Sequence, residues 1–172
     1  MVPSKIEFIM KKYGVSEVET KPYKNLKIEE PFIAVSGIIR NPRGDILLVR
    51  HNPDTGIEDK WTTPGGKVLP NESPERAIHR EIKEELNIGV LVTKLHKIIK
   101  MVSEKPKESK SKTKKANARD MENAAYLVIY ECSALDNLPR PNKKEIIEAK
   151  WFSKLPENML FKEDYLKLFI SK

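Results

Sequence analysis

Segment 73–87 is the most constraining feature of this 172-residue sequence, because it carries start and stop signals for one amphipathic helix. Ser73 is a favoured N-cap, Pro74 suits the first helical position, and Asn87 tolerates the left-handed conformation that ends many helices. The apolar residues between them recur at helical spacing at Ile78, Ile82 and Leu86. Such a stripe must pack against another element, so the segment predicts a helix docked on a sheet.

The neighbouring edge of this helix is acidic. At about 100° per residue, Glu81, Glu84 and Glu85 fall within a sector of roughly 100°. Three carboxylates so placed repel one another by a few tenths of a kcal/mol per pair or more, roughly, unless a cation compensates. Their hard oxygens suit Mg²⁺, with Mn²⁺ as an alternative, whereas the lone Cys132 and unspaced histidines disfavour zinc. A solvated charged face is the competing interpretation.

Around this helix, β-rich runs alternate with polar turns. We expect strands at 32–40, 46–50, 90–102, 124–132 and 146–152, a short strand ending in a glycine turn at 61–66, and further helices at 4–13 and 155–170. In the last helix, Phe161, Tyr165, Leu168 and Phe169 share one stripe. Residues 15–31 are a connector or a short accessory element. The sequence therefore predicts an α/β fold of the α+β type, a mixed sheet covered by helices.

Composition and charge limit the setting and the partners. We expect an N-terminal extension at 1–30, a main domain at 31–172, and within it a lysine-rich loop at about 103–123 that cannot bury a core. No apolar stretch approaches the roughly 20 residues of a membrane span, and a single cysteine fits a reducing compartment, so we expect a soluble, cytoplasmic protein. A net charge of +7 favours an anionic partner: a nucleotide, a phosphate ester or a nucleic acid.

The acidic helix belongs to a longer pattern. It reads Gly66-x5-Glu72-x7-Arg80-Glu81-Ile82-x-Glu84-Glu85-x-Asn87-Ile88. This pattern resembles the Nudix box of the Nudix hydrolases and departs from it only in having Asn87 where the family has glycine. Asn is the commonest other residue at a left-handed position. The resemblance implies an α/β/α sandwich around a mixed sheet.

The resemblance also implies roles for particular residues. The Gly66 carbonyl, Glu84 and Glu85 would be metal ligands, and Glu81 a ligand or the base that activates water. Arg80 and Glu72 would pair and hold the loop and helix in shape. Members of the family often use another acid before a late strand that ends in Trp. Glu145 occupies that place and is the candidate for an extra metal ligand or base, with Glu148 as the fallback, although a plain surface role competes for either residue.

Substrate contacts are less clearly indicated. Arg40, Arg50 and His51 end strands near the expected cleft and are candidates to meet phosphates, although surface roles compete. A base could stack on one of the aromatic residues Trp61, Tyr126, Trp151 or Phe152, although core packing competes. The helix at 4–13 would either serve a homodimer interface or cap its own core.

The resemblance implies a metal-dependent hydrolase that cleaves the pyrophosphate bond of a nucleoside diphosphate linked to another moiety. We place ADP-ribose or another nucleotide sugar first. The alternatives are an (oxidised) nucleoside triphosphate or dinucleoside polyphosphate pyrophosphohydrolase, an RNA 5′-end pyrophosphohydrolase supported by the lysine-rich loop, and a non-catalytic nucleotide-sensing module.

Overall fold

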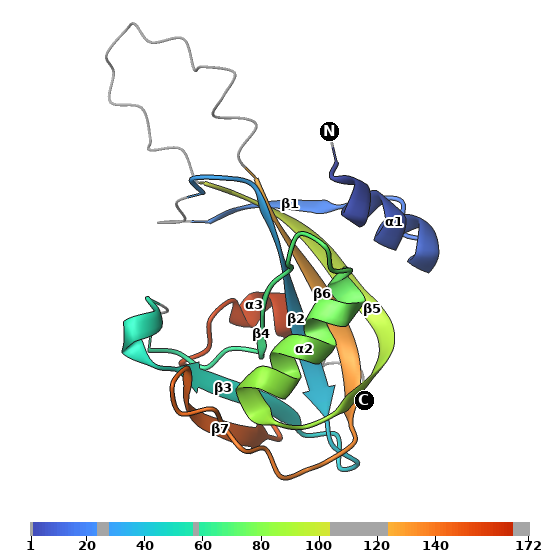
Figure 1. Ribbon diagram of the computed structural model, residues 1–172. Helices are drawn as coiled ribbons and strands as arrows, with labels where there is room; N and C mark the ends of the chain where they lie inside the picture. The colour runs from blue at the N-terminus through green and yellow to red at the C-terminus, as the bar shows by residue number, and fades with distance from the viewer. Residues whose placement is uncertain (1, 24–27, 57–58, 104–123, 167–172) are drawn as a thin grey trace, which may run out of the picture.

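The computed structural model in Figure 1 describes residues 2–23, 28–56, 59–103 and 124–166. One mixed sheet runs through it in the order β1-β5-β6-β2-β3-β7, and β4 pairs with β2 beside this path. The strands are β1 (Glu19–Tyr23), β2 (Phe32–Arg40), β3 (Ile46–His51), β4 (Gly65–Lys67), β5 (Val90–Ser103), β6 (Ala125–Ala134) and β7 (Ile146–Phe152). The helices are α1 (Ser4–Tyr13), α2 (Pro74–Leu86) and α3 (Lys162–Tyr165), with a 3₁₀ turn η1 (Pro53–Thr55).

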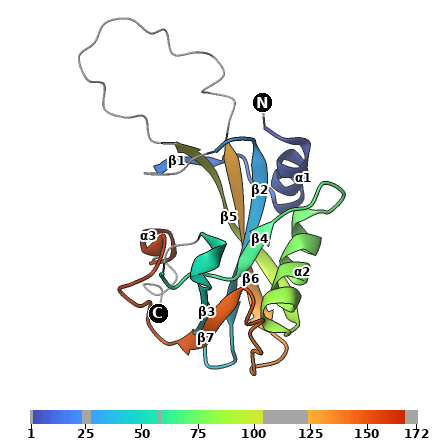
Figure 2. The same cartoon turned by 60° about the vertical axis from the view of Figure 1, so that its left-hand side comes forward.

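The sheet is mixed because its central strand β2 runs parallel to β6 and antiparallel to β3 and β4. Apolar side chains on its two faces form two cores. Figure 2 shows α1 and α2 on one face and α3 on the other. The expected α+β class and the helices on both faces of a mixed sheet are therefore confirmed.

Helix α2 forms as its signals predict. The Ser73 hydroxyl accepts the Arg76 N–H at 3.2 Å, and Asn87 ends the helix in the left-handed conformation with φ of 52°. The residues of its apolar stripe, Ile78, Ile82 and Leu86, have no exposed surface. The sheet thus fixes the rotation of α2 and, with it, the direction of the acidic edge.

Residues 2–23 join the same fold. The expected helix at 4–13 is confirmed as α1, and Gly14 ends it with φ of 66°. Its Ile6 and Ile9 are at most 1% exposed and belong to the core beneath α2. The polar stretch after α1 contains β1, which extends the sheet by pairing in parallel with β5. The accessory-element interpretation of 15–31 is therefore the one that the structure supports.

The prediction of a helix at 155–170 is wrong for its first half. Residues 155–161 are not helical: Met159 forms a bridge with Trp61, and Phe161 has φ of 54°, which an α-helix does not allow. Only Lys162–Tyr165 form a helix, and Leu168 and Phe169 lie outside the described residues. Residues 104–123, which include nearly all of the expected lysine-rich loop, also lie outside the described residues. Within the described ranges, no helix has the length and apolarity to cross a membrane.

Candidate active site

Two consecutive glycines bring β4 close to α2. β4 places Gly65 opposite Ser36 and Gly66 opposite Val35 of β2. A Cβ on Gly66 would lie 2.5 and 2.6 Å from the Glu81 carboxylate oxygens, and a Cβ on Gly65 would overlap the Val35 carbonyl. Only glycine allows this approach. The Gly66 backbone therefore lies directly against the acidic edge of α2.

Arg80 organises that edge. Its guanidinium donates to both Glu72 oxygens, at 2.8 and 2.9 Å, and this bonding lowers the Glu72 pKa. The pairing of Arg80 with Glu72 implied by the resemblance is thus present. The same group donates to Glu81 at 2.8 Å, to Glu84 at 3.0 Å and to the Lys67 carbonyl at 3.0 Å. One arginine thereby ties the strand, the loop and the helix together.

Glu85 is the buried member of the acidic set. Its carboxyl is 2% exposed and accepts the Gly65 N–H at 3.1 Å. Burial, together with the nearby charges of Glu81, Glu145 and Glu84, raises its pKa to about 8, against the opposing effect of the bond from Gly65. Burial also raises the pKa of Glu81. Four carboxylates from α2 and from the residue before β7 therefore share one electrostatic environment.

This donor set fits a hard divalent cation. Carboxylate oxygens are the ligands that Mg²⁺ and Mn²⁺ prefer, and the space left by the missing Cβ of Gly66 is bordered by the Glu81 carboxylate. Among the residues that the structure describes, no three acidic, histidine or cysteine side chains already converge on one point. Arg80 instead bridges Glu81 and Glu84. A cation would offset both the burial of the Glu85 carboxylate and its repulsion by the neighbouring carboxylates, which together raise the Glu85 pKa.

The structure brings two more of the sequence candidates to this region. Glu145 is exposed immediately before β7, and its backbone carbonyl accepts the Asn52 N–H at 2.7 Å. This bond joins the end of β3 to the start of β7. His51, which ends β3, is 8% exposed; burial lowers its pKa, against the opposing charge of Glu145. His51 therefore lies within electrostatic range of the Glu145 carboxylate.

The two arginine candidates have protein partners. Arg50 donates to Asp59 at 3.0 Å and to Glu148 at 3.2 Å, and its guanidinium lies 5.8 Å from the centre of the Trp61 ring. Glu148, the fallback acid, is thus an ion-pair partner of Arg50. Arg40 donates to the Gly44 carbonyl at 3.1 Å in the turn between β2 and β3. The partners in these contacts lie outside the acidic edge of α2.

Comparison with known proteins agrees with this geometry. The profile of the NUDIX domain matches residues 30–162, which span the whole acidic cluster and the sheet strands β2 to β7. The chain belongs to the NUDIX family.

Two curated relatives are named for different activities. The 8-oxo-dGTP diphosphatase of Escherichia coli K12 is 42% identical over 52 residues, 30% of this chain and 40% of that protein. The RNA pyrophosphohydrolase of Hahella chejuensis is 37% identical over 51 residues, 30% of this chain and 29% of that protein. The alignments thus span less than half of these relatives.

Two solved structures share the fold. The MutT NUDIX hydrolase from Burkholderia pseudomallei superposes with a TM-score of 0.59 at 24% identity, covering 83% of this chain and 100% of the other. The MutT protein from Methanosarcina mazei Go1 gives 0.61 at 22% identity, covering 84% and 96%. At these identities the likeness concerns the fold.

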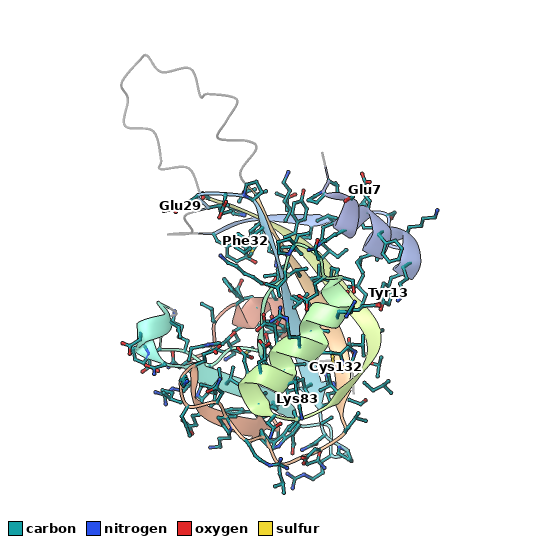
Figure 3. The ribbon with its side chains drawn as sticks, viewed as in Figure 1. Glu7, Tyr13, Glu29, Phe32, Lys83 and Cys132 are labelled. Atoms are coloured by element: carbon teal, nitrogen blue, oxygen red, sulfur yellow. The ribbon has the colours of Figure 1, made fainter. Side chains whose placement is uncertain are left out.

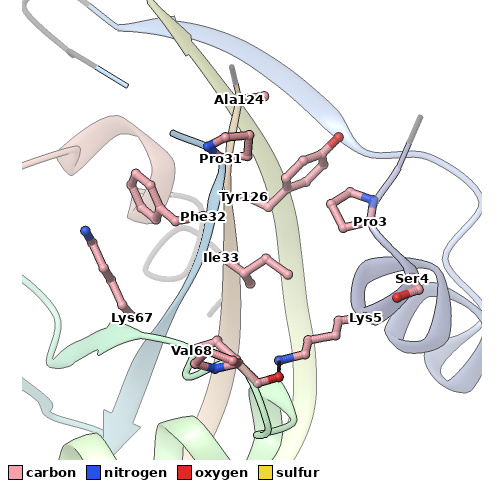
Figure 4. A pocket seen from close by; sticks show the side chains of 11 residues that line it. Pro3, Ser4, Lys5, Pro31, Phe32, Ile33, Lys67, Val68, Ala124 and Tyr126 are labelled. Atoms are coloured by element: carbon pink, nitrogen blue, oxygen red, sulfur yellow. Dashed lines mark hydrogen bonds between the residues drawn. The ribbon is translucent and has the colours of Figure 1, made fainter. Parts of the chain in front are cut away.

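A pocket of about 390 Å³ opens between the start of α1, the start of β2 and the segment that follows Gly66 (Figure 4). Lys67, the residue after Gly66, lines it, and the Lys67 ammonium lies 4.7 Å from the centre of the Phe32 ring. The other lining residues are Pro3, Ser4, Lys5, Pro31, Ile33, Val68, Pro70, Ala124 and Tyr126. Of the aromatic candidates Tyr126 lines this pocket, whereas Trp61 packs edge-on against Phe152 at 4.8 Å. Apolar walls with a few polar groups are typical of small-molecule sites of this size.

Sequence reasoning missed two contributors to this NUDIX site. Gly65 donates its N–H to Glu85, and the Gly65-Gly66 pair was the available signal. Lys5 of α1 contacts the loop that follows β4, across 64 and 65 positions of the chain. No local pattern announces a contact of that span, because it depends on how α1 packs.

Proposed function

We propose that this NUDIX domain is a divalent-cation-dependent hydrolase of the phosphoanhydride bond in nucleotides, in which a nucleoside diphosphate is linked to another moiety. The observation that carries the proposal is the shared environment of Glu81, Glu84, Glu85 and Glu145, with Glu85 buried and its pKa raised by burial and by the other three. Such a set of carboxylates is costly to keep without a cation.

In this proposal Glu84, Glu85 and the Gly66 carbonyl hold Mg²⁺ or Mn²⁺, with Glu81 as a further ligand or the base. When bound there, such a cation would supply charge neutralisation at the diphosphate and would make a water molecule more acidic. Attack by water forms one P–O bond and breaks the bridging P–O bond, and Glu81 or Glu145 takes the proton. Arg80 and Glu72 keep the Gly66 loop against α2, so that the carboxylates need not reorganise.

A double substitution tests this function. Glu84→Gln with Glu85→Gln removes two negative charges and keeps both shapes, so turnover should fall by more than about a hundredfold. The thermal midpoint should not fall, because a neutral Gln amide costs less to bury than a charged carboxylate and its oxygen can still accept the Gly65 N–H. Lys83→Gln, an exposed position on the same helix, is the matched control and should retain activity. Near-normal turnover in the double variant would refute the metal assignment.

For the substrate we propose a small nucleotide, with ADP-ribose or another nucleotide sugar as the first candidate. The pocket beside Lys67 has the size and apolar character to take an organic group attached to the diphosphate. A panel with Mg²⁺ or Mn²⁺ and product identification tests this choice. Release of AMP and ribose 5-phosphate from ADP-ribose supports it. Turnover confined to nucleoside triphosphates, with release of pyrophosphate, overturns it in favour of the activity named for the Escherichia coli relative.

An RNA 5′-end activity is the second candidate, favoured by the Hahella chejuensis relative and by the net charge of +7. Release of pyrophosphate from 5′-triphosphorylated RNA, with affinity that falls steeply with salt, would support it. Neutralising the lysines at 110, 112, 114 and 115 should then abolish that salt dependence. A domain that releases no phosphate or nucleotide product from any substrate would instead be a nucleotide-sensing module.

A further inference from the structure

Helix α1 is attached to the loop that carries the first half of the acidic motif. The Lys5 ammonium donates to the Leu69 carbonyl at 2.8 Å and to the Pro70 carbonyl at 2.7 Å. Figure 4 shows Lys5 reaching from α1 toward this loop. Leu69 and Pro70 lie between Gly66 and α2, in the segment that must place the Gly66 carbonyl and the Glu72 carboxylate.

The contact continues to the carboxylates. The Leu69 carbonyl that accepts from Lys5 also accepts the Glu72 N–H at 3.1 Å, and the Leu69 N–H donates to the Glu72 carboxylate at 3.1 Å. Glu72 in turn binds Arg80, which holds Glu81 and Glu84. An unbroken series of hydrogen bonds therefore links the α1 lysine to the acidic edge of α2.

A second attachment lies at the other end of α1. The Lys12 ammonium donates to both Glu75 oxygens at 2.7 Å, and the Tyr13 hydroxyl also bonds to Glu75. Glu75 is in the first turn of α2, and Figure 3 shows Tyr13 beside that end of the helix. Burial raises the Glu75 pKa, but the bonds from Lys12 and Tyr13 outweigh it and leave the pKa below its ordinary value.

Helix α1 has a firm base for both attachments. Ile6 and Ile9 are 0% and 1% exposed and share the core with Ile78 and Ile82 of α2. Apolar packing therefore positions α1 against α2 independently of the contacts that its lysines make. It also lies outside residues 30–162, which match the NUDIX profile. Helix α1 and its two attachments are therefore an addition to the matched domain.

We propose that Lys5 is a positioning residue for the reaction: through the Leu69 carbonyl it holds the Gly66–Glu72 loop in the form that the cation site needs. This inference rests on the proposed function. Lys5 also lines the pocket beside Lys67, so a direct substrate contact is the competing role. The two roles differ in kinetics, because positioning changes kcat and cation dependence whereas substrate contact changes KM.

Lys5→Met tests the proposal, since it keeps the apolar stem of the side chain and removes the donor. Lys11→Met, an exposed position on the same helix, is the matched control, and Lys5→Arg restores a donor. We expect kcat to fall about tenfold and the Mg²⁺ concentration for half-maximal rate to rise several-fold, with KM within about twofold. The Lys11 variant should behave as wild type and the Lys5→Arg variant should recover most of the rate.

Hydrogen exchange gives a readout that needs no turnover. In the metal-free protein, the Leu69 and Glu72 amides should exchange about tenfold faster in Lys5→Met, while α2 amides beyond its first turn keep their protection. Unchanged exchange and unchanged kcat would overturn the proposal, and so would a rise in KM alone. If Lys5→Met fails to fold, Lys12→Met supplies the same test from the Glu75 attachment. A wild type without any turnover refutes the proposed function, and exchange still decides whether Lys5 holds the loop.

Discussion

Gly66→Ala should separate activity from stability in this NUDIX domain. The added Cβ would lie 2.5 and 2.6 Å from the two Glu81 carboxylate oxygens, whereas ordinary contacts begin at about 3.5 Å. The carboxylate must therefore move by about 1 Å. It cannot swing away freely, because Arg80 donates to it at 2.8 Å and is itself held by Glu72.

The magnitude follows from this displacement. Misplacing a catalytic group by about 1 Å costs roughly a hundredfold in rate, so kcat should fall by about that factor. Only the end of one side chain has to move, so the free energy of unfolding should change by less than about 1 kcal/mol. Gly65→Ala is the comparison. Its Cβ would meet backbone atoms of Val35 and Ser36 in β2, which should cost about 2 to 3 kcal/mol of stability.

The assay measures kcat on the substrate that the wild type turns over best, together with urea unfolding of each variant. Circular dichroism confirms that Gly66→Ala keeps the native fold. A Gly66→Ala protein with kcat within about threefold of wild type would refute the reasoning, because it would show that Glu81 need not stay where the structure places it.

Three further outcomes follow from named contacts. Ile9→Ala empties a core position of α1 and should lower the free energy of unfolding by about 2 to 5 kcal/mol, whereas Phe8→Ala, 62% exposed, should change it by less than about 0.5 kcal/mol in urea titrations. Burial lowers the His96 pKa, so the unfolded chain takes up this proton at higher pH. The free energy of unfolding should therefore fall as pH drops from about 6.5 toward the folded pKa, because the folded state keeps His96 neutral while the unfolded chain takes up the proton. His96→Asn should lessen that loss in unfolding measured from pH 7.5 to 5; an unchanged dependence of stability on pH contradicts this. Glu145→Gln should lower kcat by at least tenfold or so and Glu148→Gln much less, since Glu145 is the one of these two acids whose charge acts on Glu85; equal effects in steady-state assays would contradict the choice of Glu145.

The parts of the fold that the sequence predicts well are those with local signals. Ser73, Pro74 and Asn87 mark both ends of α2, and the expected strands at 32–40 and 146–152 coincide with β2 and β7. In each case the chain carries its own capping residues or an apolar run bounded by turn residues. In these elements the tertiary structure agrees with the local conformational preference of the sequence.

The failures have non-local causes. The spacing of Phe161 and Tyr165 resembles a helix, but Met159 forms a bridge with Trp61, and Phe161 adopts a left-handed conformation. The polar β1 has no apolar alternation and exists because it pairs with β5. Sequence pattern alone does not report such pairings.

The acidic site shows the same division. Helical spacing places Glu81, Glu84 and Glu85 on one edge, yet Glu84 is exposed and Glu85 is 2% exposed. That difference arises because the Gly65 backbone lies against Glu85, which the spacing does not reveal. Arg80 is expected to bind Glu72, but its additional bonds to Glu81 and Glu84 depend on the loop geometry.

The central claim is that the acidic edge of α2 binds a divalent cation. A crystal soaked with Mn²⁺ and a nonhydrolysable nucleotide, measured at the manganese absorption edge, tests it most directly. The account predicts anomalous peaks about 2.0 to 2.3 Å from oxygens of Glu84 and Glu85, with the diphosphate in contact with the metal. Peaks confined to other parts of the molecule, with Arg80 still bridging Glu81 and Glu84, would contradict it.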